Sequence, residues 1–150
     1  MLFNTNLSHD ERERIAYASG ILSYIEIVRG AAELEDKLEE AEQGLYRLKS
    51  GAHPTMRYML TTELAQIYRR GGKVRRIHNI VMAPSLAAVR KINTWLDSKG
   101  LNRKSDGRPI LGFDSEELYK VFKYLDEGIV MIPAHAWTPW FSVFGSKSGI

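Results

Sequence analysis

Hydrophobic residues recur at helical spacing through the first third of the chain. Ser8 stands before two acidic residues, which favours the start of a helix, and hydrophobic residues then follow at helical spacing to about Gly30. A second stretch with the same period covers residues 31–48, so the pattern predicts a second helix there. Its hydrophobic positions are Leu34, Leu38, Ala41, Leu45 and Leu48.

The middle of the chain has the pattern of a β-hairpin. Residues 57–68 and 74–82 are rich in hydrophobic, aromatic and β-branched side chains, and Gly71-Gly72 lies between them. Two such segments separated by a short glycine-containing segment are typical of strands joined by a tight turn. Residues 50–54, before the hairpin, predict a loop because proline disfavours helix in the residue that precedes it.

The chain after the hairpin alternates between helix and strand. Ser85 and Asp114 have the character of helix caps, and the helices that follow them are expected to end near Gly100 and Gly128. The continuous hydrophobic run 129–133 predicts a strand buried on both faces, which after a helix indicates an α/β fold. No repeat or linker divides the chain, so we expect one domain. The chain stops soon after an aromatic, turn-rich stretch, and we expect it to be a piece of a larger structure.

Composition excludes several classes of protein. The 150 residues are 44% hydrophobic and 26% charged, as expected for one ordinary globular domain. No hydrophobic run approaches the roughly 20 residues of a membrane-spanning helix, and we expect a cytoplasmic protein. The absence of cysteine leaves His, Asp and Glu as metal ligands. The chain also contains neither a complete phosphate-binding loop nor a Gly-x-Ser-x-Gly elbow, so the sequence does not support an ATPase or a common covalent hydrolase.

The net charge of +3 is unevenly distributed along the chain. Residues 1–50 carry ten acidic and six basic side chains, a net charge of −4. Residues 51–150 carry eight acidic and fifteen basic side chains, a net charge of +7. A basic surface attracts polyanions through the release of condensed counterions, so we expect any contact with nucleic acid in this later part.

Glu63 and His78 are the first candidate functional residues, because each places a polar side chain within a hydrophobic strand. A buried lone carboxylate costs free energy unless a cation or hydrogen bonds compensate it. Glu63 is therefore either an exposed residue on the solvent face of an edge strand or a metal ligand. His78 is either a hydrogen-bonded structural histidine or a ligand. The basic residues nearby either contact phosphate or form a solvated turn and an exposed strand face; they are Arg69, Arg70, Lys73, Arg75 and Arg76.

His135 directly follows the hydrophobic run 129–133. In α/β barrels catalytic side chains lie where strands end and loops begin, so His135 is placed as a ligand or a base would be. Trp137 and Trp140, together with two prolines, form either a rigid wall that stacks a base or sugar, or a packed aromatic lid without a ligand. The two other histidines are expected on the surface; they are His9 and His53.

Four longer motifs resemble endonuclease Q, a DNA repair nuclease of the PHP (polymerase and histidinol phosphatase) group. The resemblance covers residues 34–150 and leaves residues 1–33 as a helical segment without a match. The four motifs agree in order and spacing. They are Leu60-Thr-Thr-Glu63, Gly71-Gly-Lys-Val-Arg-Arg-Ile-His78-Asn79, Ser105-Asp-Gly-Arg-Pro-Ile-Leu-Gly112 and the run from Ile132 to Gly149.

The resemblance implies a distorted α/β barrel with metal ions at its carboxyl face. It implies cleavage of DNA on the 5′ side of deaminated bases such as uracil and hypoxanthine, and of abasic sites. Glu63, His78 and His135 would be metal-binding and catalytic residues, with divalent Zn, Mn or Mg as the metal. DNA containing such nucleotides would be the partner, and the candidates for contacting it are Arg75, Arg76, Lys147, Trp137 and Trp140.

The sequence also departs from the pattern of that family. A first strand ending in His-x-His is absent from residues 1–33, and the late Asp and His ligands would lie beyond Ile150. We therefore expect a partial PHP-like barrel lacking its first and last strands, with N-terminal helices, weak metal binding and impaired cleavage. The alternatives are a non-catalytic nucleic-acid-binding protein and a small-molecule phosphoesterase of the PHP group.

Overall fold

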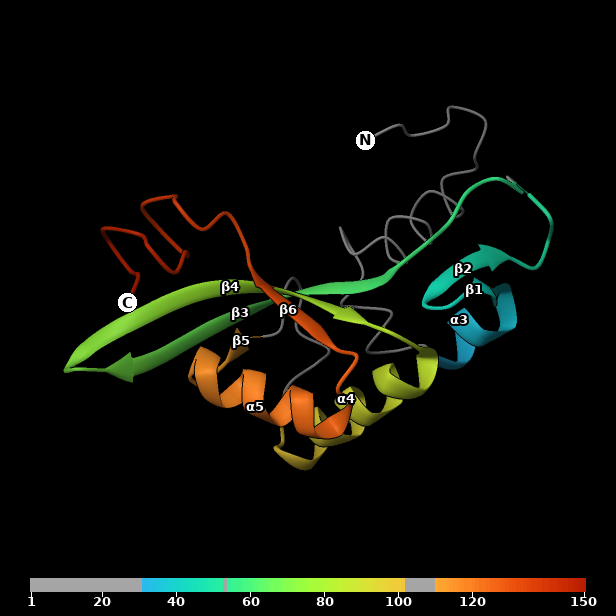
Figure 1. The fold of residues 1–150 in the computed structure, drawn as a ribbon. Coiled ribbons are helices and arrows are strands. Elements are labelled where there is room, and N and C mark those ends of the chain that lie inside the picture. Colours follow the sequence, from blue (N-terminus) through green and yellow to red (C-terminus); the bar gives the residue numbers. More distant parts are fainter. Residues whose placement is uncertain (1–30, 53, 102–109) are drawn as a thin grey trace.

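The computed structural model describes residues 31–52, 54–101 and 110–150. Its centre is a four-stranded mixed sheet in the order β5 (Ile110–Leu111), β3 (Leu60–Arg70), β4 (Lys73–Ala83) and β6 (Val130–Pro133). Helices α4 (Leu86–Ser98) and α5 (Ser115–Leu125) lie on one side of the hairpin β3-β4, and residues 134–150, the C-terminal segment, lie on the other (Figure 1). The fold is mixed α/β, as the sequence predicts. The helix expected over residues 8–30 and most of the motif 105–112 lie outside the described residues.

The hairpin expected from the sequence is confirmed. Strand β3 (Leu60–Arg70) pairs along all its 11 residues with the antiparallel strand β4 (Lys73–Ala83). Gly71 and Gly72 form the turn with φ angles of 60° and 75°. Two consecutive residues with positive φ are what a tight hairpin turn of this hand requires, and glycine adopts this conformation without steric cost.

One face of this hairpin forms the hydrophobic core. Side chains alternate between the two faces of a strand, and Leu60, Leu64, Val81 and Ala83 all point to the side of the helices. The strand pairing places Glu63 and His78 on the opposite face. The core residues from helix α4 (Leu86–Ser98) and helix α5 (Ser115–Leu125) are Ala88, Val89, Ile92, Leu96, Leu118 and Phe122.

Both helix starts predicted for the last two thirds of the chain are confirmed. The Ser85 hydroxyl accepts a hydrogen bond of 3.1 Å from the backbone N–H of Ala88, and the Asp114 carboxylate accepts one of 2.8 Å from that of Glu116. Such caps satisfy backbone donors that the first helical turn leaves without partners. No helix within the described ranges combines the length and the hydrophobicity needed to cross a membrane.

The prediction of one helix over residues 31–48 is wrong. A short helix α3 (Ala31–Lys37) is followed by strands β1 (Leu38–Glu42) and β2 (Leu45–Leu48), which pair antiparallel. Gly44, with a φ of 75°, lies in the turn between them. The leucines repeat at a spacing compatible with helix, but Leu38 pairs across the hairpin with Leu48, so tertiary packing overrides the local period.

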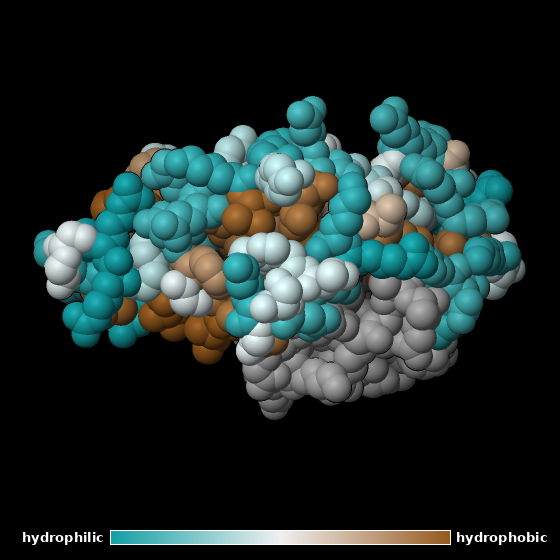
Figure 2. All heavy atoms as spheres, turned by 90° about the horizontal axis from the view of Figure 1, so that it is seen from below, coloured by the Kyte–Doolittle hydropathy of each residue, from teal (hydrophilic) through white to brown (hydrophobic). Residues whose placement is uncertain are grey.

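The prediction of a strand buried on both faces at residues 129–133 is half wrong. Strand β6 (Val130–Pro133) forms, but it lies at the edge of the sheet, antiparallel to β4, and Val130 and Ile132 are exposed. The other edge is the short strand β5 (Ile110–Leu111), parallel to β3. An edge strand has a neighbour on one side only, which leaves its side chains less covered. Figure 2 shows hydrophobic surface among hydrophilic residues on the side of the molecule seen from below.

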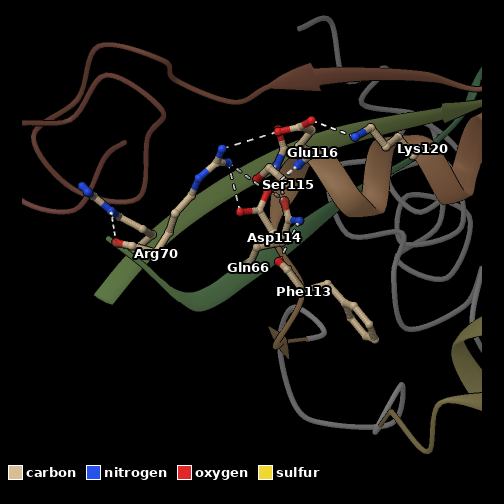
Figure 3. Close-up of polar contacts among 9 residues, drawn as sticks. Gln66, Arg70, Phe113, Asp114, Ser115, Glu116 and Lys120 are labelled. Carbon is tan, nitrogen blue, oxygen red and sulfur yellow. Dashed lines mark hydrogen bonds and ion pairs between the residues drawn. The ribbon is translucent and has the colours of Figure 1, made fainter. Parts of the chain in front are cut away.

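Polar side chains fix the start of α5 against β3 (Figure 3). Arg70 Nη1 lies 3.1 Å from Asp114 Oδ2, and Arg70 Nη2 lies 3.5 Å from Glu116 Oε2. The hydrogen bond and charge of Lys120, followed by the charge of Arg70, lower the pKa of Glu116 below its usual value. Arg70 is thus paired with two carboxylates at the start of α5. Next to these ion pairs, Asn79 on β4 donates hydrogen bonds to Gln66 on β3 and to Ser115 on α5. These bonds connect the helix start to both strands of the hairpin.

Candidate metal centre

Three side chains from distant parts of the sequence meet on the face of the sheet opposite α4 and α5. Glu63 comes from β3, His78 from β4, and His135 from the segment after β6. Each side chain offers one ligand atom, and these three atoms all lie within 4.8 Å of one another. The strand register explains the first pair: His78 lies opposite Ala65, which shares a face with Glu63.

The three ligand atoms form a tight cluster. His78 Nδ1 lies 2.9 Å from Glu63 Oε1 and 3.2 Å from His135 Nε2, while His135 Nε2 lies 3.6 Å from the same carboxylate oxygen. Side-chain exposure rises from 8% at His78 through 20% at Glu63 to 38% at His135. The cluster therefore has a buried side, formed by the hairpin, and a side open to solvent, formed by His135.

The backbone after β6 holds His135 in an unusual conformation. Its φ is 32°, in the left-handed region that L-residues other than glycine and asparagine seldom adopt. The Ala134 N–H donates to His78 O at 2.9 Å, and the Thr138 N–H donates to His135 O at 3.0 Å. These bonds at both ends hold the strained residue over β4, and strain of this kind is concentrated at functional sites.

The strain at His135 gives a stability prediction. A His135→Gly variant is expected to be more stable than His135→Ala by about 1 kcal/mol, because glycine adopts positive φ without the steric cost that alanine retains. Both variants lack the imidazole, so lost contacts cancel in the comparison. The free energy of unfolding of each variant, measured with denaturant, checks this. Equal free energies of unfolding for His135→Gly and His135→Ala would contradict the strained geometry.

The C-terminal segment, residues 134–150, forms backbone hydrogen bonds with the part of β4 that precedes its pairing with β6. The N–H of His78 donates to Phe141 O at 3.0 Å, and that of Arg76 donates to Ser148 O at 3.0 Å. Ser148 is buried: its hydroxyl accepts from the Phe141 N–H at 2.7 Å and donates to Arg76 O at 3.2 Å. A Cβ at Gly145 would come within 2.7 Å of three atoms, so the tight fold of this segment requires glycine there.

The sequence-based search for site residues missed Thr138, Phe141 and Ser148. Thr138 hydrogen-bonds with the ring of His135, and the Phe141 ring packs on that of His78 with centroids 4.8 Å apart. Their side chains are ordinary for a turn, and only the long-range fold brings them to the cluster. The recurrence of hydroxyl residues between the aromatic ones was the one available signal.

The remaining predicted residues lie around the cluster with different accessibility. Arg75 donates hydrogen bonds to the carbonyls of Arg70 and Gly149, so its guanidinium holds the C-terminal segment. Trp137 is 81% exposed and Trp140 is also exposed, which argues against the alternative of a packed aromatic lid. Arg76 is half-buried and Lys147 is exposed. The expectation that the other two histidines are surface residues concerns positions outside the described ranges, His9 and His53.

The donor set suits a divalent metal. One carboxylate oxygen and two imidazole nitrogens are ligands that zinc and other first-row metals accept. Three protein ligands with an open side are also typical of catalytic rather than structural sites, since catalysis needs a free coordination position. The alternative of an exposed Glu63 on an edge strand is excluded, because β3 lies inside the sheet and Glu63 is only partly exposed.

A mixed α/β sheet that carries a Glu-His-His cluster on one face places the chain among α/β proteins with a candidate metal centre. Within this class, the chain is similar to solved structures of endonuclease Q, which confirms the resemblance seen in the sequence. Neither a model of a known protein family nor a curated protein matches the sequence.

Two solved structures illustrate the similarity. The first is endonuclease Q in complex with a 27-mer duplex substrate that has an abasic lesion at the active site; its TM-score is 0.60 at 22% identity, over 93% of this chain and 34% of that one. The second is the lesion-specific endonuclease PfuEndoQ from Pyrococcus furiosus, with a TM-score of 0.53 at 27% identity, over 73% of this chain and 24% of that one. The chain thus spans about a third or less of the length of either.

Proposed function

We propose that the chain carries part of the catalytic domain of a DNA repair endonuclease of the endonuclease Q type. The observation that carries the proposal is the meeting of Glu63, His78 and His135 in a chain whose fold is similar to endonuclease Q. We further propose that residues 1–150 belong to a single incomplete PHP-like domain, a distorted barrel without its first and last strands, of which residues 34–150 are the part that resembles endonuclease Q. The reaction would be hydrolysis of a phosphodiester 5′ of a deaminated base or an abasic site.

Within this proposal, Glu63, His78 and His135 would hold divalent metal ions. Such ions supply an activated water and stabilise the charge that develops on the phosphate. The hairpin fixes Glu63 and His78 rigidly, because their strands are paired along the whole length of β3. The exposed edge of His135 leaves room for a phosphate to approach from solvent.

The C-terminal segment would bind the DNA next to this centre. Trp137 stacks on Phe144, with ring centroids 4.7 Å apart and an interplanar angle of 24°, and both side chains are exposed. One face of an 81% exposed indole therefore remains available for a nucleobase. Trp140 would help to shape the surface that holds the nucleotide, and the candidates for phosphate contacts are Arg75, Arg76 and Lys147.

The stacking role predicts a selective loss of DNA affinity. Trp137→Ala is expected to weaken binding of a lesion-containing duplex by about 5- to 150-fold, since a base stacked on an aromatic ring contributes about 1–3 kcal/mol. Fluorescence anisotropy of a labelled duplex at fixed salt measures this. Tyr124→Ala is the matched control, because Tyr124 is 90% exposed and lies on α5. Equal affinities of the two variants would remove Trp137 from the proposed interface.

Cleavage tests the proposal as a whole. The purified chain would be assayed for bound metal by elemental analysis, and for nicking of a uracil-containing duplex with and without Mn²⁺. We expect slow nicking 5′ of the uracil, none in the same duplex with thymine, and loss of nicking in Glu63→Ala and His135→Ala. A chain that binds neither metal nor DNA would refute the proposal.

A non-catalytic nucleic-acid-binding protein is the second candidate, favoured by the net charge of +7 on residues 51–150. It predicts DNA binding whose affinity falls steeply with salt, without metal and without nicking. Binding of this kind that is unchanged in Glu63→Ala would favour it over the endonuclease.

A further inference from the structure

The hydroxyl of Thr138 lies at the centre of a small hydrogen-bond network around His135. Thr138 Oγ1 lies 3.0 Å from His135 Nδ1, 2.9 Å from Trp140 O and 3.1 Å from His135 O. Two of these three neighbours are carbonyl oxygens, which can only accept hydrogen bonds. An oxygen pair separated by 2.9 Å has the distance of a hydrogen bond, so the single Thr138 proton points to a carbonyl.

The direction of that proton determines the tautomer of His135. With its proton donated to a carbonyl, the Thr138 hydroxyl offers only a lone pair to His135 Nδ1. His135 Nδ1 must then carry the hydrogen, and in the neutral imidazole the lone pair lies on Nε2. Nε2 is the atom that faces Glu63 Oε1 and His78 Nδ1, at 3.6 and 3.2 Å.

We infer that Thr138 is a positioning residue that holds His135 in the Nδ1–H tautomer and so presents Nε2 to the metal centre. The use of this tautomer in metal binding rests on the proposed function, whereas the tautomer itself rests on the three distances at Thr138. The same side chain acts on the backbone. It bonds to His135 O, the carbonyl of the residue whose φ is 32°, and so supports both the orientation and the tautomer of the ring.

The Nδ1–H tautomer of His135 also fits the hydrogen bonding within the cluster. If Nε2 of His135 is an acceptor, and the Glu63 carboxylate is one as well, then His78 Nδ1 is the donor to both, at 3.2 and 2.9 Å. With the opposite tautomer, the Nε2 hydrogen of His135 would face the Nδ1 hydrogen of His78. The contact of 3.2 Å between the two ring nitrogens is therefore compatible with the Nδ1–H tautomer of His135.

Nitrogen NMR tests this directly. In the ¹⁵N-histidine-labelled chain without metal, at a pH where the imidazoles are neutral, the protonated and unprotonated ring nitrogens have distinct shifts, and the His135 signals are identified by their loss in His135→Ala. We expect the Nδ1–H tautomer in the wild type and in Thr138→Ser, which keeps the hydroxyl. In Thr138→Val we expect a partial shift towards Nε2–H, because only the Nδ1 hydrogen of His78 then disfavours that tautomer. Ser142→Ala is the matched control, because Ser142 Oγ donates to the backbone carbonyl of Thr138 and not to its hydroxyl.

A predominantly Nε2–H tautomer in the wild type, or an unchanged Nδ1–H tautomer in Thr138→Val, would overturn the inference. A shift of equal size in Ser142→Ala would also overturn it, because the tautomer would then depend on the segment as a whole.

Metal affinity is the second readout. Titration with Zn²⁺ is expected to show about 10- to 100-fold weaker binding by Thr138→Val than by the wild type, the usual effect of removing a group that orients a ligand histidine, with recovery in Thr138→Ser. Wild-type and Thr138→Val chains that bind Zn²⁺ equally would overturn the positioning role. A wild type that holds the Nδ1–H tautomer but binds no Zn²⁺ would support the tautomer assignment and contradict the proposed function, so the two failures are distinguishable.

Discussion

Glu63→Gln is expected to lower the affinity of the chain for Zn²⁺ or Mn²⁺ by at least about 100-fold. Loss of a group that merely orients a metal ligand costs about 10- to 100-fold, and loss of the anionic ligand itself is expected to exceed this. Glu63 supplies the only carboxylate of the three-residue cluster, so the substitution keeps the shape of the side chain and removes its charge. Isothermal titration calorimetry of the metal-free chain measures the effect.

Glu39→Gln is the matched control for this experiment. Glu39 lies on β1 and pairs with Arg47 at 2.7 Å, in a hairpin separate from the four-stranded sheet. This variant is expected to bind metal like the wild type. Similar affinities for Glu63→Gln and the wild type would show that metal binds elsewhere or not at all.

Phe122→Ala is expected to lower the free energy of unfolding by about 3–5 kcal/mol, the range found when a buried phenylalanine is truncated. Phe122 is fully buried on α5, and its ring meets that of Trp95 on α4 at a centroid distance of 6.1 Å. The substitution leaves a cavity where the two helices pack against the sheet. Because domains are typically stable by about 5–15 kcal/mol, much of the stability would be lost.

The control for Phe122 lies two residues further along the same helix. Tyr124 is 90% exposed, and Tyr124→Ala is expected to change the free energy of unfolding by less than about 0.5 kcal/mol. Urea unfolding of both variants checks the contrast. Losses of similar size would mean that α5 does not pack through the face that includes Phe122.

The sequence predicted those elements whose signals are local. The turn glycines 71 and 72 determine the hairpin, and the capping side chains of Ser85 and Asp114 determine where two helices start. Each of these signals acts within a few residues and depends little on contacts with the rest of the chain. Strand β6 was also located correctly, because a short hydrophobic run after a helix indicates a strand.

The errors arose where tertiary contacts decide between alternatives. The leucines of residues 31–48 satisfy a helical period, yet the cross-strand pair of Leu38 and Leu48 stabilises a hairpin instead. The burial of residues 129–133 depends on the order of strands in the sheet, and the sequence of this run carries no information about that order. A continuous hydrophobic run is thus compatible with an edge strand.

The candidate site was predictable only in part. The pairing of Glu63 with His78 follows from the hairpin register, since a two-residue turn at 71 and 72 places His78 opposite Ala65. The approach of His135 requires the C-terminal segment to turn back over β4, and no local pattern specifies this path. The contribution of Thr138 depends on that path as well.

The alternation of side chains in β3 and β4 separates two tasks between interleaved positions. Leu60 and Leu64 point to the core with Val81, whereas Glu63 and His78 point to the other face, so neighbouring residues serve either folding or chemistry. Substitutions on the site face can therefore alter ligands or charge with little disturbance of the packed core. Such a hairpin is a suitable scaffold for evolving or engineering a new activity, because the stability of the fold and the identity of its reactive groups are set by different residues.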